Sequence, residues 1–259
     1  MTALSVDIRA KTYPSRTPGA NHTALKDISF TVPEGQFTCI LGPSGSGKTT
    51  LLNIVSGLDR AMEGDVRLTE NGALDPASMP IGYMFQTPRL FPWLSVLDNV
   101  RIVMDQEGIA SGEAEKLLKA MGLEDVFQAY PNRLSGGMQR RVALARAFAV
   151  RPKLLLMDEP FVSLEAPVAD RLRQLLIDTW SGRRTTVLFV THDLSEALTL
   201  ADRILFLSKS PGHVVLDLDV DIPRPRRPQD PEIERFQRRL LADYPQLLAG
   251  LLSVAREGA

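Results

Sequence analysis

Hydrophobic residues near the start of the chain form short runs with the alternation typical of β-strands. One run covers residues 4–10 and another covers residues 28–32. The polar segment between them, residues 12–22, contains two prolines and one glycine. This pattern predicts two antiparallel strands that are joined by a loop.

A third apolar run, residues 36–41, ends at a glycine-rich turn. Residues 48–56 then have the spacing of a helix, and Gly57 occupies the position at which a glycine commonly ends a helix. The sequence therefore predicts a strand, a glycine turn and a helix in immediate succession.

The rest of the chain first becomes helical and then alternates between strands and helices. From about residue 88 to residue 150 apolar residues recur three and four positions apart, most clearly at 113–121 and 138–150. Later β-type runs cover 154–158, 186–191, 204–208 and 214–218, with helical stretches at 168–180 and 194–201. Alternating strands and helices predict an α/β fold with a mostly parallel sheet, plus an N-terminal antiparallel β subdomain and an inserted α-helical subdomain.

The character of the chain changes after Ile222, where residues 223–228 form a short linker of three prolines and three arginines. The arginines are Arg224, Arg226 and Arg227. They are consistent with a solvated linker, or with a contact to lipid headgroups or to a regulatory partner. A helical stretch follows that has three apolar residues on one face, Ile233, Phe236 and Leu240.

These patterns predict two parts of the chain. Residues 1–221 form the main domain, with the helical subdomain inserted at about 88–152. Residues 222–259 form the linker and a C-terminal helical tail.

Composition places the chain among ordinary globular proteins. The 259 residues carry 30 Lys and Arg against 31 Asp and Glu, and the net charge of −1 gives no electrostatic reason to expect nucleic acid as a partner. The single cysteine, Cys39, lies in an apolar run and predicts a buried thiol in a reducing compartment. Asp7 and Arg9 argue against an export signal, and no apolar stretch reaches the ~18 residues of a spanning helix. We therefore expect exposure to the cytosol.

A glycine-rich motif connects the predicted strand at 36–41 with the predicted helix at 48–56. The pattern G-x-x-x-x-G-K-[ST] is matched by Gly42, Pro43, Ser44, Gly45, Ser46, Gly47, Lys48 and Thr49. In such a loop the backbone N–H groups and the helix N-terminus hold phosphate, the lysine reaches the β- and γ-phosphates, and the hydroxyl can ligate Mg²⁺. A chance Gly/Ser turn is the alternative, but the flanking strand and helix favour nucleotide binding.

Two adjacent carboxylates follow four hydrophobic residues at 154–157. They are Asp158 and Glu159. Because open α/β sheets bind ligands at the carboxyl ends of their strands, we expect Asp158 to hold Mg²⁺ and Glu159 to polarise a water in line with the γ-phosphate. Taken alone, the pair would favour a solvated acidic turn; together with the phosphate loop it favours a metal and catalytic site.

A second motif, Leu-Ser-Gly-Gly-Met-Gln, precedes the predicted helix at 138–150. Ser135, Gly136 and Gly137 leave backbone N–H groups open at the start of this helix, which makes it a second candidate anion site. An ordinary serine N-cap followed by flexible glycines explains the same residues. The presence of the phosphate loop and the Asp-Glu pair in the same chain favours the anion site.

The phosphate loop, the Leu-Ser-Gly-Gly-x-Gln motif and the Asp-Glu pair, in this order, closely resemble the nucleotide-binding subunit of ATP-binding cassette (ABC) transporters. The resemblance covers about residues 4–218. It implies an ATPase that binds ATP and Mg²⁺ and forms a head-to-tail dimer with a second copy of itself. Each ATP would lie between the phosphate loop of one copy and Ser135, Gly136 and Gly137 of the other. The resemblance also implies integral membrane permease subunits as partners, and peripheral binding at the cytoplasmic face of the membrane.

The resemblance gives roles to four further residues. Gln86 matches the loop glutamine that contacts Mg²⁺ and water, and His192 matches the switch histidine that holds the γ-phosphate. Tyr13 is the candidate for the aromatic residue that stacks on adenine, and Thr50 extends the nucleotide-binding residues beyond Thr49. Without the family pattern, each of these residues would be unremarkable.

One position departs from the family pattern. After the catalytic glutamate the family usually has an aspartate in a Ser-x-Leu-Asp-like segment, whereas residues 161–165 read Phe-Val-Ser-Leu-Glu. That aspartate bridges the two subunits. The longer side chain of Glu165 either weakens coupling between the two sites or is accommodated by a shifted loop.

Residues 87–100 and 210–215 resemble the importer branch that serves nitrate, sulfonate, taurine and pyrimidine precursors. The resemblance implies an importer that receives its cargo from an extracytoplasmic solute-binding protein, and it leaves the cargo open. Leu90, Phe91 and Trp93 would suit a groove that receives a short helix of a membrane partner. Alternatively, Trp93 packs inside the helical insertion.

Two functions of other classes use some of the same motifs. A soluble ABC-type ATPase that acts on DNA or on the ribosome usually has a long coiled coil or two tandem cassettes, and the sequence shows neither. A P-loop kinase needs an acceptor pocket and has no use for residues 135–137. The sequence therefore favours the energising subunit of an importer, with no nucleic acid as a partner.

Overall fold

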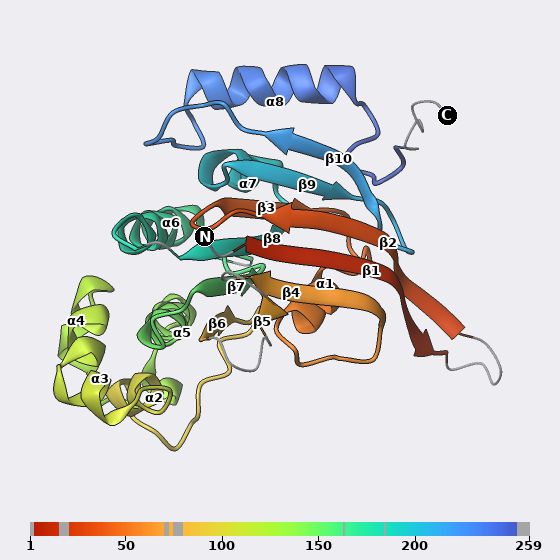
Figure 1. Ribbon diagram of the computed structural model, residues 1–259. Coiled ribbons are helices and arrows are strands. Elements are labelled where there is room, and N and C mark those ends of the chain that lie inside the picture. Colours follow the sequence, from red (N-terminus) through yellow and green to blue (C-terminus); the bar gives the residue numbers. More distant parts are fainter. Residues whose placement is uncertain are drawn as a thin grey trace. The chain divides into compact units, whose positions relative to one another are not determined.

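Figure 1 shows a computed structural model of the chain, in which the described residues fall into two compact units. Unit 1 comprises Met1–Ser78 and Thr186–Ala259, and unit 2 comprises Met79–Thr185. The structure describes residues 3–15, 21–69, 73–74, 80–162, 164–183 and 185–252.

The first sheet of unit 1 is antiparallel and has the strand order β2-β1-β4-β5. Its strands are β1 (Ala3–Pro14), β2 (Asn21–Val32), β4 (Glu63–Thr69) and β5 (Ala73–Leu74). The side chains of β1 alternate between buried and more exposed positions as the pleat requires, and the buried ones are Leu4, Val6 and Ile8. One face of this sheet therefore contributes to the core.

The predicted loop at residues 12–22 is partly wrong. Strands β1 and β2 continue into it, and Tyr13 pairs with His22 after a register shift at Lys11. Strand β4 pairs with β1 only as far as Ala10, so the end of the β1–β2 hairpin is a two-stranded ribbon. Polar residues are tolerated there because a ribbon needs backbone partners but has no buried face to fill. Residues 16–20 of the predicted loop lie outside the described residues.

The second sheet of unit 1 is mostly parallel, in the order β10-β9-β3-β8. Its strands are β3 (Phe37–Leu41), β8 (Thr186–Thr191), β9 (Arg203–Leu207) and β10 (Val214–Asp219). Strand β3 is parallel to both β8 and β9, and β10 is antiparallel to β9. Every residue of β3 and β8 is buried, which explains why their sequences read as continuous apolar runs and do not alternate.

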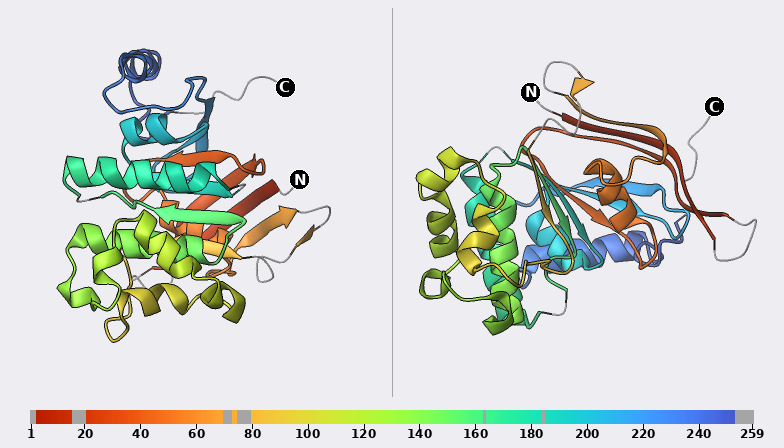
Figure 2. Two further views of the ribbon diagram at one scale, coloured as in Figure 1. Left: turned by 90° about the vertical axis from the view of Figure 1, so that its left-hand side faces the viewer. Right: turned by 90° about the horizontal axis from the view of Figure 1, so that it is seen from below.

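Three helices belong to unit 1. They are α1 (Lys48–Val55), α7 (Leu194–Leu200) and α8 (Pro231–Asp243). Helix α8 buries Ile233 and Leu240 and contacts α7; Figures 1 and 2 show these two helices in blue and cyan.

Unit 2 contains one parallel strand pair and five α-helices in its described residues. Strand β6 (Ile81–Met84) pairs with β7 (Leu154–Asp158). The helices are α2 (Val96–Arg101), α3 (Gln106–Ala110), α4 (Glu113–Ala120), α5 (Gly136–Ala149) and α6 (Ala166–Ser181), with short 3-10 helices at Glu124–Val126 and Pro131–Arg133. Helix α5 contacts α2, α4 and β6, so it is the centre of this unit.

The predicted fold class is confirmed. The structure combines a mostly parallel sheet, an N-terminal antiparallel sheet and a helical segment. Strands β4 and β5 were not predicted; Leu68 is the one residue of β4 whose side chain is described as buried, so the segment lacks an apolar pattern. The division at residue 221 and the insertion at about 88–152 stay predictions.

A buried lysine ties β1 to the segment after α1. The Nζ of Lys11, which is 2% exposed, donates to Asp59 Oδ1 at 2.7 Å and to the Ala61 carbonyl at 2.6 Å. The Tyr13 hydroxyl donates to Asp59 Oδ2 at 2.9 Å. Burial alone would raise the pKa of Asp59, but the hydrogen bonds from Lys11 and Tyr13 lower it below its ordinary value. The ionised carboxylate is therefore stabilised by the folded state.

We predict that Asp59→Asn lowers the free energy of unfolding by about 1–3 kcal/mol at pH 7, because Lys11 keeps its charge and loses its counter-ion. A depressed pKa in the folded state gives stability that is present above the ordinary carboxyl pKa of about 3.9 and is lost as pH falls through the folded value. Urea unfolding should therefore show a difference between wild type and variant that shrinks on acidification below about pH 4.

Asp65→Asn is the matched control, because Asp65 pairs with Arg67 on the surface and should change stability little at any pH. An Asp59→Asn effect of the same size at pH 7 and in acid would contradict the assignment.

Candidate functional site

Two of the predicted site elements follow neighbouring parallel strands. Leu41, the last residue of β3, is in register with Thr191, the last residue of β8. The phosphate loop therefore begins with Gly42 at the same edge of the sheet at which His192 leaves β8. This edge is formed by carboxyl ends of strands, where α/β proteins bind ligands.

The phosphate loop is closed by its own lysine. The buried Nζ of Lys48 donates to the Gly42 carbonyl at 2.8 Å and to the Pro43 carbonyl at 3.0 Å. Gly45 and Gly47 have φ angles of 80° and 90°, in the left-handed region that favours glycine. These two glycines allow the backbone to curve around the Lys48 ammonium group and to continue directly into α1.

The start of α1 fits a phosphate group. Gly47 is its N-cap, and no N-cap side chain covers the start of the helix, whose first-turn N–H groups point toward the loop. The hydroxyl of Ser46 is buried and has no hydrogen-bond partner among the described residues. An oxyanion in the loop would supply an acceptor for this hydroxyl.

The residues also fit Mg²⁺ bound together with a nucleotide. The described residues contain no cluster of three His, Cys, Asp or Glu side chains that could hold a metal alone. Mg²⁺ usually keeps several waters and takes one or two protein oxygens plus substrate phosphates. The Thr49 hydroxyl in unit 1 offers an oxygen of the type that it prefers, and so do the Asp158 carboxylate and the Gln86 amide in unit 2. Their binding of one Mg²⁺ stays a prediction.

The turn that contains Gly212 lies between β2 and the phosphate loop and contacts both. Gly212 donates its N–H to the Ala24 carbonyl at 2.9 Å, and its carbonyl accepts from the Lys26 N–H at 2.9 Å. A Cβ at Gly212 would lie 2.0 Å from the Ser46 carbonyl oxygen. Only a glycine permits this contact with the loop. Gly212 was not predicted to belong to the site, because the contact joins segments far apart in the chain.

His192 stands at the junction of β8 and α7 with an exposed side chain. The next residue, Asp193, caps α7 by accepting from the N–H groups of Ser195 and Glu196. The Thr191 hydroxyl donates to the Glu196 carboxylate at 2.8 Å, which ties the end of β8 to the first turn of α7. The backbone on both sides of His192 is thus fixed by short-range hydrogen bonds.

Tyr13 is placed beside α1 in unit 1. Burial raises the pKa of its hydroxyl, and the side chains of Thr50 and Asp59 hydrogen-bond to it. The Nζ of Lys11 lies 4.4 Å from the ring centroid. One face of the ring therefore contacts a cation, and stacking of adenine on Tyr13 stays a prediction for the other face.

Unit 2 brings three predicted residues together. Met84 of β6 is in register with Met157 of β7, so Gln86 follows the strand beside the one that ends in Asp158. The Gln86 amide donates to Glu159 Oε2 at 3.4 Å. Asp158 is 4% exposed, and Glu159 has a φ angle of 44°. This left-handed backbone, uncommon for glutamate, turns Glu159 away from the direction of the strand.

Ser135 begins α5 as the sequence predicts. Its Oγ accepts from the Met138 N–H at 3.2 Å, so it acts as an N-cap. The hydroxyl hydrogen can still be donated to an anion, and both Ser135 and Gly136 are exposed. Glu165, the residue that departs from the family pattern, is the N-cap residue of α6; it is exposed and its side chain makes no capping hydrogen bond. Ser163 lies outside the described residues.

Comparison with known proteins decides the family. A model of the family described as ABC transporter matches residues 25–162. The chain belongs to the ABC transporter family. It is therefore an ATP-binding ABC cassette, an enzyme that hydrolyses ATP.

Individual relatives agree with this assignment. The aliphatic sulfonates import ATP-binding protein SsuB 2 of Burkholderia cenocepacia is 43% identical over 238 residues, which are 92% of this chain and 86% of the relative. The SsuB protein of Bacillus subtilis is 33% identical over 243 residues, which are 93% of this chain and 94% of that protein. The ATP-binding cassette MJ0796, solved as a dimer in a post-hydrolysis state bound to ADP and Pi, matches with a TM-score of 0.73 and 33% identity, over 85% of this chain and 100% of that one.

The ABC cassette contains a further arginine that the sequence did not single out. Arg140 of α5 donates to the carbonyls of Gln86, Pro160 and Val162, at 3.1, 2.9 and 2.8 Å. It thus joins the loop of Gln86 to the segment after Glu159, and burial lowers its pKa. In the sequence it is one of two adjacent arginines on a helix, a pattern that usually indicates a solvated face.

The predicted site residues of the cassette fall into three groups. The phosphate loop, Thr50, Tyr13 and His192 belong to unit 1. Gln86, Asp158 and Glu159 lie together in unit 2, and residues 135–137 start α5 of the same unit. Their roles toward ATP stay predictions.

We predict that Gly212→Ala destabilises the cassette by about 1–3 kcal/mol and weakens ATP binding, because the new methyl group pushes the Ser46 carbonyl and with it the phosphate loop. Thermal unfolding and equilibrium titration with a fluorescent ATP analogue measure the two effects. Gly182→Ala is the matched control, since a Cβ there meets nothing within 4 Å and the φ angle of −80° suits alanine. Unchanged ATP affinity in Gly212→Ala would show that the turn does not shape the loop.

Proposed function

We propose that this chain is the ATP-hydrolysing subunit of an importer for a small solute, namely a sulfonate-, nitrate- or taurine-like anion or a pyrimidine precursor. The single observation that carries the proposal is the 43% identity to a sulfonate import ATP-binding protein over 92% of the chain. Identity of this extent across both units reaches beyond the motifs that all ABC cassettes share. It favours aliphatic sulfonates among the possible cargoes.

The proposed chemistry divides between the two units. Lys48 and the N–H groups at the start of α1 hold the β- and γ-phosphates, and His192 contacts the γ-phosphate. Bound Mg²⁺, held by Thr49, Asp158 and Gln86, would neutralise charge on the phosphate oxygens. Glu159 accepts the proton of the attacking water. The hydrogen bond between Gln86 and Glu159 supports this assignment, because it fixes the carboxylate at the end of β7.

A second copy of the chain is the proposed partner in the site. In a head-to-tail dimer, residues 135–137 of one copy would bind the nucleotide that the phosphate loop of the other copy holds. The exposure of Ser135 and Gly136 at the start of α5 supports this arrangement. The dimeric structure of the cassette MJ0796 supports it as well. ATP binding would close the dimer, and hydrolysis would reopen it.

Unit 2 offers a groove for a membrane permease. A cavity of about 430 Å³ is lined by apolar side chains, together with Arg89 and Arg146. The segment that carries the lining residue Phe91 is held by the buried Asn99. The Asn99 amide donates to the Phe91, Leu94 and Ser95 carbonyls, and its oxygen accepts from the Phe91 N–H. The apolar lining comes from Ile81, Tyr83, Phe85, Phe91, Val103, Ala147 and Val150.

Trp93 supports the groove as an interface. Its side chain is 70% exposed, so the alternative that it packs inside the helical insertion is wrong. It lies 5.4 Å from Phe91, ring centroid to ring centroid. An exposed aromatic pair beside an apolar groove is typical of a surface that receives an amphipathic helix.

The proposed location is the cytoplasmic face of the cell membrane, through the permease. Among the described residues, no helix combines the length and the apolar character that crossing a membrane requires. An extracytoplasmic solute-binding protein would select the cargo and meet the permease on the other side.

The alternative of an ATPase that acts on DNA or the ribosome receives no support from the relatives, because those that match over most of the chain include several sulfonate import subunits. Purification of the tagged chain from its own host, with gentle solubilisation and an ATP analogue, tests the proposal. A polytopic permease in the eluate is the expected result. Recovery with ribosomes or DNA alone would overturn the importer assignment.

We predict that Glu159→Gln retains ATP binding but lowers kcat by about 10²–10⁴-fold, because the amide cannot accept the proton of the attacking water. Size-exclusion chromatography with ATP should then show a trapped dimer. Lys48→Ala is the contrasting variant, in which nucleotide binding itself is weakened. A Glu159→Gln protein that hydrolyses ATP at the wild-type rate would remove the residue from the role of base.

We also predict that Trp93→Ser lowers the amount of co-purified permease at least about tenfold, while ATP affinity stays the same, because a few residues, tryptophan prominent among them, carry most of the binding energy of an interface. Leu58→Ser is the control, since Leu58 is 65% exposed in unit 1, away from the groove residues in the sequence. Equal loss of permease in both variants would contradict a specific interface at the groove.

A further inference from the structure

Helix α7 connects the predicted switch histidine with the C-terminal tail. It has seven residues, about two turns, and starts two positions after His192. A helix of this length is not stable by itself, so its position depends on the packing of its six buried residues and on what holds its two ends. Its first turn is held by Asp193 and Glu196, as described above.

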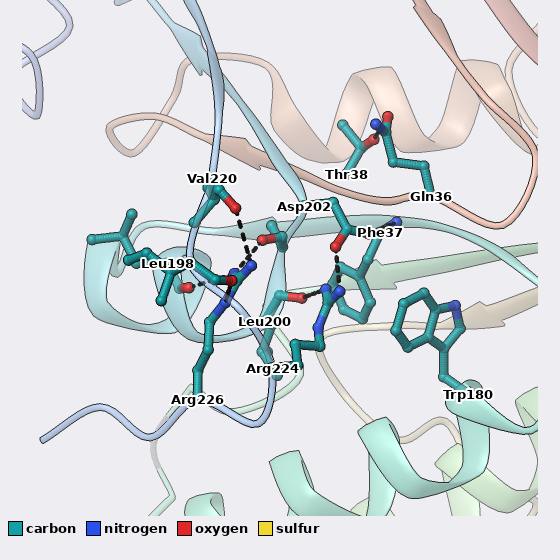
Figure 3. A network of polar contacts seen from close by, with 12 residues as sticks. Gln36, Phe37, Thr38, Trp180, Leu198, Leu200, Asp202, Val220, Arg224 and Arg226 are labelled. Carbon is teal, nitrogen blue, oxygen red and sulfur yellow. Dashed lines mark hydrogen bonds and ion pairs between the residues drawn. The ribbon is translucent and has the colours of Figure 1, made fainter. Parts of the chain in front are cut away.

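The last turn of α7 is held by an arginine of the tail, Arg226, as Figure 3 shows. Its Nη1 donates to the Leu198 carbonyl at 2.9 Å and to the Ala201 carbonyl at 2.6 Å. The same guanidinium donates to the Val220 carbonyl at 3.1 Å and to the Ile222 carbonyl at 2.7 Å. One side chain thus satisfies carbonyls at the negative end of α7 and binds them to the tail.

A second arginine extends this contact to the strand before the phosphate loop. Arg224 donates to the Leu200 carbonyl and forms an ion pair with Asp202 (Figure 3). The other oxygen of Asp202 accepts from the Phe37 N–H at 2.9 Å, at the start of β3. The end of α7, the start of β3 and the tail therefore share one hydrogen-bonded network.

The interpretations of the linker as solvated, or as a lipid contact, are therefore wrong for Arg224 and Arg226. Their guanidinium groups point into the protein and are bound to carbonyls and to Asp202 (Figure 3). Burial and the neighbouring Arg224 lower the pKa of Arg226 to about 10, so it keeps its charge at neutral pH. The sequence pattern of alternating proline and arginine could not show this, because the acceptors in α7 and at Asp202 lie 22 or more residues earlier.

The far end of the tail returns to the phosphate loop. The Gly250 carbonyl accepts from the Lys209 N–H at 3.0 Å, and a Cβ at Gly250 would lie 2.9 Å from Cγ of Pro43. Between these two ends, α8 buries Ile233 and Leu240 and contacts α7. The tail thus contacts both the phosphate loop, at Pro43, and helix α7, which follows His192.

We propose that Arg226 is a positioning residue for ATP hydrolysis, which acts by fixing α7 and thereby His192 next to the phosphate loop. This inference rests on the role of His192 under the proposed function. It assigns the C-terminal tail to the catalytic apparatus of the cassette, where the sequence predicts only an appended segment. An arginine that merely anchors the tail would use the same contacts, so the test must report on His192.

The test is a double-mutant cycle in the full-length chain, with kcat for ATP hydrolysis and the equilibrium Kd for ATP measured for each protein. Arg226→Ala should lower kcat about 10- to 100-fold, the range expected when a catalytic group is misplaced by about 1 Å, with Kd within about twofold of wild type. His192→Ala should lower kcat as well. The double variant should be no slower than His192→Ala, because the two residues act through one interaction.

Arg226→Lys and Arg239→Ala complete the set. Lysine keeps the cation but has three donors in place of five, so an intermediate kcat is expected; if Arg226→Ala fails to fold, the cycle is run with Arg226→Lys. Arg239 lies on the outer face of α8 with 87% of its side chain exposed, and its replacement should leave kcat unchanged.

Each outcome separates the inference from the proposed function. Independent losses that multiply in the double variant, or an Arg226→Ala protein with wild-type kcat, would overturn the positioning role. Wild-type hydrolysis by His192→Ala would instead remove the histidine from the proposed site, whatever Arg226 does. A fall in ATP affinity with unchanged kcat would show that the tail acts on the phosphate loop through Pro43 and not on α7.

Discussion

The parallel pairing of β3 with β8 is the constraint on which the nucleotide-binding half of unit 1 depends. It places Leu41 opposite Thr191, so the phosphate loop and His192 emerge at one edge of the sheet. Both strands are buried throughout, which leaves their register no freedom to slip without exposing apolar residues. Two further contacts involve β3 or the loop that follows it. Gly212 packs against Ser46 of the phosphate loop, and Asp202 accepts a hydrogen bond from the Phe37 N–H at the start of β3.

Local patterns were sufficient for the fold class and for the elements that carry the motifs. The strand, turn and helix at residues 36–56 are neighbours in the chain, and each is specified by its own residues. The ribbon at Tyr13, by contrast, is held by backbone pairing with the next strand, and its polar residues have the composition of a loop. Gly212 and Arg140 were missed because their contacts are with segments far away in the chain: a glycine against Ser46 and an arginine that binds three carbonyls have no local signature.

Arginines hold loops together in both units. Arg140 gathers carbonyls beside Gln86 and Glu159, and Arg226 gathers carbonyls at the end of α7. A guanidinium suits this task because its five donors have a fixed planar arrangement that can satisfy several acceptors at once. The net charge of the chain therefore does not show that some of its arginines bind backbone carbonyl oxygens inside the protein.

The two carbonyls that Lys48 holds have a consequence for the thermodynamics of nucleotide binding. A lysine side chain that becomes ordered loses up to about 2 kcal/mol of rotamer entropy. Here that loss is incurred when the protein folds, because Gly42 and Pro43 already restrain the ammonium group. On binding a triphosphate, the Lys48 ammonium group would exchange the two carbonyl oxygens for phosphate oxygens, and no mobile side chain would have to be ordered. More of the electrostatic attraction between the lysine and the phosphates would therefore appear as binding affinity.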